Sequence, residues 1–174
     1  MAQQARKKPF EGLRVADFAW VGVGPTVSKY LADHGAEVIR IESSTYPEAL
    51  RRVGPFVNDT PNIDGSGYYA NFNSSKLCMS VNFKHPRGPE LVRRLVAKCD
   101  VVTESYTPGT MARFGFDYES LSAGRDDLLM VSMPLYGQTG PWANYMGYGH
   151  VLQAASGFNH LTGWEDGPPI GTGI

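Results

Sequence analysis

The sequence has few cysteines, no long hydrophobic run and almost no net charge. Its two cysteines, Cys78 and Cys99, are too few for a disulfide framework and do not have the spacing of a metal site. The longest apolar stretch, residues 15–23, contains an aspartate and is too short to span a bilayer. No apolar signal region follows the basic start. We therefore predict a reduced, cytoplasmic protein that binds neither a metal nor a membrane.

The net charge of −1 gives no electrostatic reason to expect binding to nucleic acid. Basic residues at positions 6–8 form only a short run, so we interpret residues 1–10 as a basic tail. Apolar residues make up 42% of the chain and charged residues 19%, which is ordinary for a globular domain. The remaining residues, 11–174, are enough to form one hydrophobic core.

Strand-like and helix-like patterns alternate along most of the chain. Strands are predicted at residues 13–20, 37–42, 76–83, 101–104 and 128–133. Helices are predicted after Pro25, from Pro86, at 108–114 and at 148–156. Residues 47–67 and much of the last third are expected to be irregular. This alternation indicates an α/β fold with a largely parallel sheet and flanking helices.

Helical spacing also predicts which side chains are buried. In the first helix the predicted face consists of Val27, Tyr30, Leu31 and His34. In the helix from Pro86 it consists of Leu91, Leu95 and Cys99, opposite a wet face of Arg87, Glu90, Arg94 and Lys98. Gly35 is expected to end the first helix as its C-terminal cap.

Ligands of parallel α/β sheets bind beyond the carboxyl ends of the strands. This rule selects the loops that follow four strand ends, at Trp20, Glu42, Glu104 and Met133. Three nearby side chains could hold phosphates or stack on an adenine, namely Lys76, Arg113 and Tyr106. The alternative is that these are ordinary exposed or half-buried residues, so the residues alone predict a ligand edge without naming its ligand.

The loop after the first strand nearly matches a dinucleotide-binding fingerprint. Gly22 and Gly24 supply G-x-G, and Glu42 lies 20 residues after Gly22, where an acid would bind a ribose hydroxyl. However, Val27 replaces the third glycine and Pro25 lacks an N–H for a phosphate. These departures favour a tight strand-to-helix turn over a nicotinamide or flavin site.

A series of segments, in order along the chain, resembles the family III CoA-transferases. They are RVADF with the G-x-G-P loop (14–25), LADHGAEVIRIE (31–42), NSSK (73–76), VTESYTPG (102–109), MARFG (111–115), YGQTGP (136–141), QAASG (153–157) and GPP (167–169). The resemblance implies a Rossmann-like large domain of a two-domain subunit, two of which interlock as a homodimer. Residues 11–174 would be the N-terminal part of that domain, truncated at its C-terminus.

The resemblance also implies a reaction. Coenzyme A would pass from an acyl-CoA to a carboxylic acid through an aspartyl-CoA intermediate, with CoA as a substrate and no metal. In the family the attacking aspartate follows the G-P-P segment, which places it beyond Ile174. This chain is therefore expected to carry the CoA-binding part and to be inactive alone.

The resemblance also implies which residues of this chain contact CoA. The matching positions are Gly22, Val23, Ser43, Lys76, Ser105, Tyr106, Arg113 and Phe114. One alternative is an α-methylacyl-CoA racemase-like enzyme, although its histidine position holds Tyr148 here and His150 lies two residues further on. Another is a non-catalytic CoA-binding partner subunit.

Overall fold

The order and direction of five strands define the fold. The computed structural model describes residues 7–172. Its sheet has the order β3-β2-β1-β4-β5, and all its strand pairings are parallel, which confirms the predicted α/β class. The strands are β1 (Arg14–Asp17), β2 (Glu37–Glu42), β3 (Leu77–Ser80), β4 (Val101–Glu104) and β5 (Leu129–Ser132).

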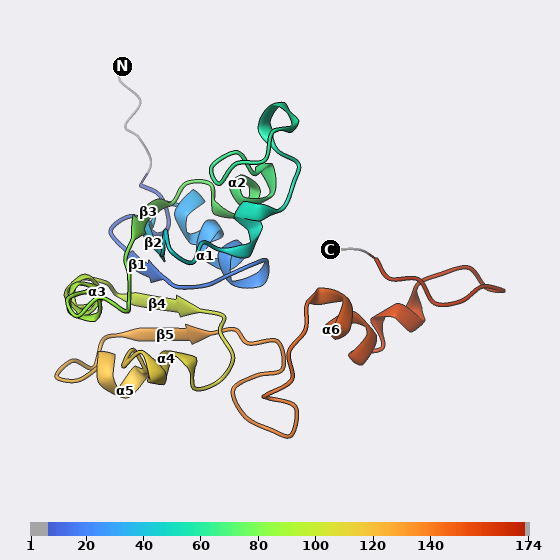
Figure 1. Ribbon diagram of the computed structural model, residues 1–174. Helices are drawn as coiled ribbons and strands as arrows, with labels where there is room; N and C mark the ends of the chain where they lie inside the picture. The colour runs from blue at the N-terminus through green and yellow to red at the C-terminus, as the bar shows by residue number, and fades with distance from the viewer. Residues whose placement is uncertain (1–6, 173–174) are drawn as a thin grey trace, which may run out of the picture.

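Helices and irregular segments connect the strands (Figure 1). The α-helices are α1 (Val23–Asp33), α2 (Gly67–Asn73), α3 (Gly88–Val96), α4 (Thr110–Arg113), α5 (Tyr118–Leu121) and α6 (Gly149–Ala155). The short turn α5 escaped prediction because its signal is one N-cap, Asp117, whose side chain accepts from the Ser120 N–H. Short 3-10 helices are η1 (Ala49–Arg52), η2 (Val57–Asp59) and η3 (Phe158–Leu161).

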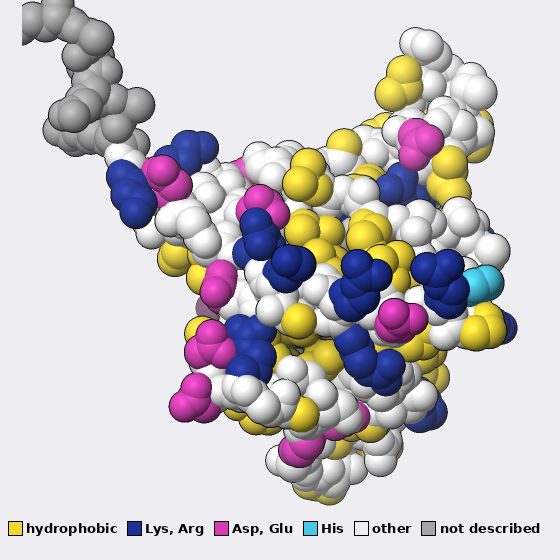
Figure 2. Space-filling view, turned by 90° about the vertical axis from the view of Figure 1, so that its left-hand side faces the viewer, with side chains coloured by type: hydrophobic (Ala, Val, Ile, Leu, Met, Phe, Trp, Pro, Cys, Tyr) yellow, Lys and Arg dark blue, Asp and Glu magenta, His cyan; other side chains and the backbone are white. Residues whose placement is uncertain are grey.

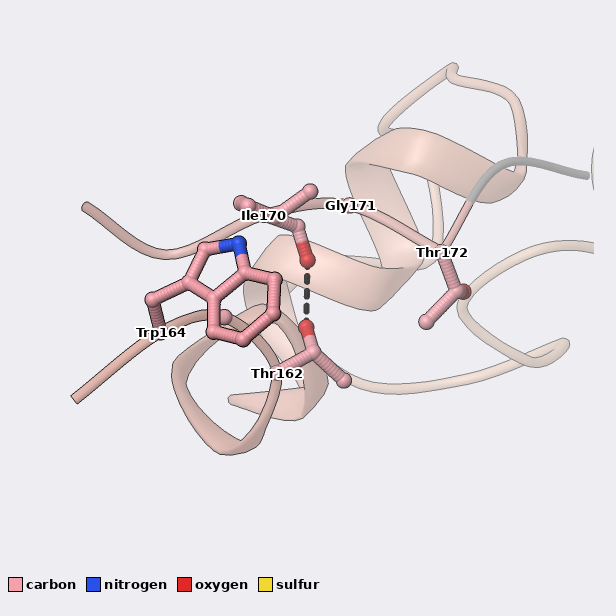
Figure 3. A pocket seen from close by; sticks show the side chains of 6 residues that line it. Thr162, Trp164, Ile170, Gly171 and Thr172 are labelled. Carbon is pink, nitrogen blue, oxygen red and sulfur yellow. Dashed lines mark hydrogen bonds between the residues drawn. The ribbon is translucent and has the colours of Figure 1, made fainter. Parts of the chain in front are cut away.

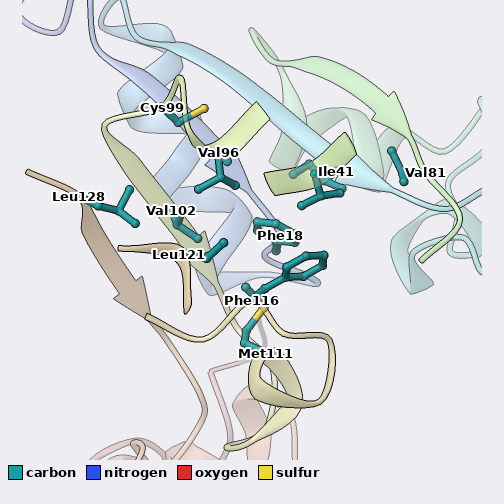
Figure 4. Close-up of a cluster of buried hydrophobic side chains, with 12 residues drawn as sticks. Phe18, Ile41, Val81, Val96, Cys99, Val102, Met111, Phe116, Leu121 and Leu128 are labelled. Atoms are coloured by element: carbon teal, nitrogen blue, oxygen red, sulfur yellow. The ribbon is translucent and has the colours of Figure 1, made fainter. Parts of the chain in front are cut away.

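The central strands β1, β2 and β4 bury side chains on both faces of the sheet, as expected for parallel strands covered on both faces. On one face a small cluster packs against α1 and contains Val15, Ala32, Ala36, Val38 and Val101. On the other face a larger cluster packs against α3, α4 and α5; its labelled members in Figure 4 include Phe18, Val96, Val102, Met111, Phe116 and Leu121. Adjacent strand residues therefore point into different cores.

The predicted buried face of α1 is wrong for Val27, Tyr30 and His34, whereas Leu31 is half-buried and packs against the small cluster as predicted. Tyr30 is 61% exposed and Val27 is 38% exposed. The buried residues are instead small ones: Gly24, Pro25, Ser28 and Ala32. Because α1 approaches the sheet mainly through small side chains, Val27 and Tyr30 are turned outward, and a pattern that counts large apolar residues places them wrongly in the core. Gly35 ends α1 as predicted, with a φ of +111°.

Helix α3 shows a smaller error of the same kind. Leu91 is 46% exposed, whereas Cys99 is buried as predicted. The inward positions of the helix itself are Gly88, Val92 and Val96. The predicted wet face is confirmed, and Figure 2 shows Lys and Arg side chains, with interspersed acidic ones, across this side of the molecule.

Helix α6 and η3 lie apart from the sheet in a C-terminal arm, residues 134–172 (Figure 1). The side-chain amide of Gln138 donates to Glu104 at 3.1 Å and links the arm to the end of β4. Large apolar side chains of the arm are exposed, including Trp142, Tyr145, Met146, Tyr148, Leu161 and Trp164. Within residues 7–172 no helix is long and apolar enough to cross a membrane.

The predicted basic tail lies mostly outside the described residues, which begin at Lys7. Its last part contacts the end of α1, where the Phe10 N–H donates to the His34 carbonyl at 3.1 Å.

Candidate functional site

A cavity of about 710 Å³ opens at the carboxyl edge of the sheet. It is lined by residues at the ends of β1 to β4 and in the loops after them: Trp20, Ile41, Glu42, Ser43, Thr45, Tyr46, Asn82, Phe83, Lys84, Tyr106, Thr110 and Phe114. This is the edge at which the sequence predicted a ligand, and its volume is in the range of small-molecule sites.

Aromatic rings form much of the wall of this cavity. Trp20 stacks on Tyr46 with ring centroids 5.7 Å apart and an interplanar angle of 21°. Tyr106 lies 6.0 Å from Trp20, and Phe83 contacts Phe114 edge-on at 5.3 Å. Flat apolar surfaces of this kind suit a heteroaromatic base or an acyl chain.

Three predicted contact residues, Ser43, Tyr106 and Phe114, line the cavity. A fourth, Ser105, braces the wall instead. Its Oγ accepts from the Trp20 N–H at 2.8 Å and donates to the Trp20 carbonyl at 3.0 Å. The loop after β4 therefore fixes the backbone of the residue that ends the β1 segment.

Three further predicted residues lie near the cavity without lining it. Gly22 caps α1, and its carbonyl accepts from the Thr26 N–H at 3.0 Å. Val23 is 67% exposed. Arg113 is also exposed, and its Nη2 donates to Oγ1 of the cavity residue Thr110 at 2.7 Å. Contact of these residues with CoA stays a prediction.

Lys76 is buried beneath the loops and has its own partners. Its Nζ donates to Asp17 at 3.0 Å, to Asn73 at 2.9 Å and to the Pro25 carbonyl at 2.9 Å. Its side chain is 0% exposed. Burial lowers the pKa of Lys76, and the charge of Asp17 opposes that shift. Lys76 thus links β1, α1 and α2 through its three hydrogen bonds. To bind a phosphate, its ammonium group would have to break these bonds.

Lys84, which the sequence reasoning missed, is the one Lys or Arg among the described residues that line the cavity. The predicted third strand ran to Phe83, but β3 ends at Ser80. Residues 81–84 therefore belong to the loop at the carboxyl edge. The same rule that selected the other loops would have found Lys84 if the strand end had been placed correctly.

Beneath the cavity three carboxylates surround one buried guanidinium. Arg40 lies 3.5 Å from Asp17, 3.1 Å from Glu42 and 2.9 Å from Glu48. Each of these four side chains is at most 8% exposed. The carboxylates are scattered in the sequence, and only the order of the strands brings them together.

Glu42 lines the cavity but is already engaged. Besides Arg40, it accepts from Arg51 at 2.8 and 3.1 Å and from the Tyr69 hydroxyl. Burial alone would raise the pKa of Glu42, but the hydrogen bonds from Arg51 and Tyr69 outweigh it and hold the pKa below its ordinary value. A carboxylate occupied in this way is poorly placed to bind a ribose, which agrees with the tight-turn interpretation of the first loop.

After Phe18, whose N–H still donates to the Thr103 carbonyl of β4 at 2.8 Å, the turn between β1 and α1 is held by side chains. The Ala19 N–H donates to Asp17 at 3.0 Å, and the Ala19 carbonyl accepts from Arg40 at 2.7 Å. The Val21 N–H donates to Glu48 at 2.8 Å. Val21 has a φ of +64°, a left-handed conformation that costs a side-chain-bearing residue roughly 1–2 kcal/mol. Such strain persists only where surrounding contacts enforce it.

A smaller cavity of about 300 Å³ lies within the C-terminal arm (Figure 3). The Thr162 hydroxyl donates to the Ile170 carbonyl across it, and Trp164 on its wall is 82% exposed. Its lining residues carry no titratable side chain. The carboxyl-edge cavity, with its cation and aromatic walls, is therefore the candidate site.

A parallel α/β sheet with such a cavity defines a Rossmann-like ligand-binding domain. The sequence profile of CoA-transferase family III matches residues 10–174, and the chain belongs to that family. It is 39% identical over 168 residues to succinyl-CoA:glutarate CoA-transferase of Mus musculus, covering 96% of this chain and 37% of the mouse protein. It is 40% identical over 172 residues to succinate–glutarate CoA-transferase of Agrobacterium fabrum, covering 97% and 43%.

The solved structure of a CAIB/BAIF family protein from Brucella suis superimposes with a TM-score of 0.88 at 36% identity. It covers 97% of this chain and 44% of the Brucella chain. The chain thus spans less than half the length of these relatives. The family and fold predicted from the sequence are confirmed.

Proposed function

We propose that the protein carrying this chain transfers coenzyme A from an acyl-CoA to a carboxylic acid and binds the coenzyme in the carboxyl-edge cavity. The observation that carries the proposal is the cavity itself, where aromatic walls and Lys84 meet in a member of CoA-transferase family III. The names of the mouse and Agrobacterium relatives support a dicarboxylic acid as the acceptor.

The lining residues suit the parts of coenzyme A. An adenine or the pantetheine chain would lie against the rings of Trp20, Tyr46 and Tyr106. Lys84 would pair with a phosphate, and Arg113 on the adjoining helix could supply a second cation. The hydroxyls of the cavity would donate further hydrogen bonds to phosphate oxygens.

The reaction we propose uses a carboxylate nucleophile. Its oxygen attacks the acyl carbon, the C–S bond breaks and CoA leaves as a thiolate, which leaves a mixed anhydride between the enzyme carboxylate and the acyl group. The thiolate then attacks the enzyme's own carbonyl carbon, which releases the donor acid and leaves an enzyme–CoA thioester. The acceptor carboxylate repeats these steps in reverse, which forms the new acyl-CoA and restores the enzyme carboxylate.

Glu42 is the single carboxylate among the described residues that line the cavity. Its oxygens accept from Arg40, Arg51 and Tyr69, so attack by Glu42 would break a buried network. This supports an aspartate outside residues 7–172 as the nucleophile, at the position beyond Ile174 that the family resemblance implies. The 174-residue chain is then expected to bind CoA without reacting.

Binding is tested by calorimetric titration of CoA into the wild-type chain and into the variant Lys84→Met. We expect the dissociation constant to rise roughly tenfold, because one charge-assisted contact to a phosphate is lost. Lys98→Met is the matched control, since Lys98 is exposed just after α3 and does not line the cavity. Equal affinities of Lys84→Met and wild type would exclude this cavity as the phosphate site.

Catalysis is tested by the intact mass of the protein after incubation with acyl-CoA thioesters. A CoA adduct that hydroxylamine removes is expected in a version extended past Ile174 and not in the 174-residue chain. An adduct on the shorter chain would show that the nucleophile lies within it. Solvent deuterium exchange at the α-carbon, without an acceptor acid, would instead support a racemase.

We also propose that the complete protein is an interlocked homodimer. Support comes from the arm, where Tyr145 is 62% exposed, Met146 81% and Trp164 82%. An apolar surface of this kind is normally covered by other protein. Sedimentation of the complete protein at the mass of one subunit would refute the dimer.

A further inference from the structure

Glu48 is buried, charged and outside the cavity, yet it connects two segments that form the cavity wall. Its side chain is 0% exposed, and it does not line the cavity. It lies two residues after Tyr46 in the chain, and its carboxylate bonds to the residue directly after Trp20. The Glu48 side chain thus links the segment that carries Tyr46 to the segment that carries Trp20, the two rings that stack on one another.

Each oxygen of the Glu48 carboxylate has a separate partner. Oε1 accepts from the Val21 N–H at 2.8 Å, and Oε2 accepts from Arg40 Nη2 at 2.9 Å. Arg40 is itself held by Asp17 and by the Ala19 carbonyl. Glu48 is therefore fixed from below by a cation and can hold the backbone of the turn from a defined position.

The turn needs such a hold because Val21 has a left-handed backbone. A β-branched residue with a φ of +64° leaves this region unless its surroundings fix it. Relaxation of Val21 would rotate the peptide that joins it to Trp20 and break the hydrogen bond from Ser105 Oγ to the Trp20 carbonyl. The indole would then leave its stacked position on Tyr46.

We propose that Glu48 is a positioning residue that sets the aromatic wall of the cavity, by holding Val21 in the left-handed conformation and so keeping Trp20 stacked on Tyr46. The effect on coenzyme A rests on the proposed function, whereas the effect on the stack does not. Glu48 touches no ligand in this proposal and acts through the backbone of the β1–α1 turn.

The test compares Glu48→Gln with Glu37→Gln in a background where Trp142 and Trp164 are replaced by phenylalanine. Glu37 is the matched control, because it also pairs with an arginine, Arg14 at 2.7 Å, but at the amino end of β2. The near-ultraviolet circular dichroism and emission of Trp20 report the stack, and calorimetry reports the affinity for CoA. All are measured well below the unfolding temperature of each variant.

We expect Glu48→Gln to lose the Trp20 dichroism band and shift its emission to the red, with the far-ultraviolet spectrum unchanged. The apparent dissociation constant for CoA should rise roughly tenfold if the formed wall falls to about a tenth of the population. Adding Val21→Gly should recover part of the affinity, since glycine adopts a positive φ without help. Glu37→Gln should change none of these readouts.

A Glu48→Gln protein with the wild-type dichroism band would overturn the proposal, and so would weaker CoA binding with an intact stack. If wild type fails to bind CoA, the proposed function fails while the dichroism still decides the role of Glu48. If Glu48→Gln does not fold, amide exchange in wild type decides instead. Slow exchange of the Val21 N–H supports the hold by Glu48, and exchange at the rate of an open loop refutes it.

Discussion

Replacing Gly24 by alanine is expected to destabilise the protein, although alanine is the better helix former. A Cβ at Gly24 would lie 2.4 Å from the Ala19 Cβ and 3.1 Å from the Ser105 Cβ. Carbon atoms pack at about 3.5–4.0 Å, so α1 would have to move by at least about 1 Å from the turn. Neither neighbour is the end of a flexible side chain, so the backbone must absorb the shift.

The magnitude follows from two opposing terms. Overpacking of this kind costs about 1–3 kcal/mol, and the gain in helix propensity from glycine to alanine returns at most about 1 kcal/mol. The 2.4 Å approach places the overpacking cost in the upper part of its range, about 2–3 kcal/mol, so we expect Gly24→Ala to lower the free energy of unfolding by about 1–2 kcal/mol. Urea unfolding followed by far-ultraviolet circular dichroism measures this value.

Gly22→Ala is the matched control for that measurement. A Cβ there meets nothing within 4 Å, and the φ of Gly22 is −96°, which alanine adopts freely. We expect a change within about 0.5 kcal/mol. If Gly24→Ala were as stable as Gly22→Ala, the close approach of α1 to the β1–α1 turn would be wrong.

Two further predictions concern acid stability and the core. The pKa of Glu42 in the folded protein lies below its ordinary value of 4.5, because Arg51 and Tyr69 donate hydrogen bonds to its ionised carboxylate. The stability that these bonds contribute is therefore complete above pH 4.5 and is lost as the pH falls through the folded pKa. Urea titrations between about pH 5 and 3 should therefore show a steeper loss of stability in wild type than in Glu42→Gln, and parallel slopes would contradict this. Phe116→Ala should cost about 3–5 kcal/mol, since Phe116 is 0% exposed, whereas Phe114→Ala at 39% exposure should weaken CoA binding more than stability; equal losses of stability in the two variants would be inconsistent with the described core.

The strands and the ligand edge could be predicted because both follow from local pattern. Runs such as Val101–Val102 are apolar without alternation, as strands buried on two faces must be. Their spacing, with helices between, requires parallel pairing and places the loops after them at one edge. Tyr106 was found on the cavity wall for this reason, whereas Ser43 and Phe114, which also line it, were predicted from the family resemblance.

The interior of the site could not be predicted, because it depends on contacts between distant segments. Asp17 and Lys76 meet only since β1 and β3 flank β2 and the loops close above them. The sequence shows Lys76 as a charged residue beside a strand, which suggests solvent exposure. Likewise, the buried face of α1 is set by how closely the helix approaches the sheet, and helical spacing alone carries no information on that distance.

The buried charges beneath the cavity are better explained by backbone geometry than by the stability of ion pairs. A buried pair often gains little over apolar residues of the same shape, because desolvation offsets the attraction. Asp17 and Glu48, however, each give one oxygen to a cation and the other to a backbone N–H, that of Ala19 at 3.0 Å and that of Val21 at 2.8 Å. Apolar residues could replace the ion pairs but would leave those N–H groups buried without an acceptor.

This distinction explains where the charges lie in the fold. The central strands β1, β2 and β4 each have a paired neighbour on both sides, and the ion pair at the amino end of β2, Arg14–Glu37, is exposed. At the carboxyl edge the chain leaves the ladder of β1 and turns into α1, so its N–H groups need side-chain acceptors. The same departure from the ladder opens the space above the sheet. Buried charge and the cavity therefore occur at one edge because both result from the same irregular backbone.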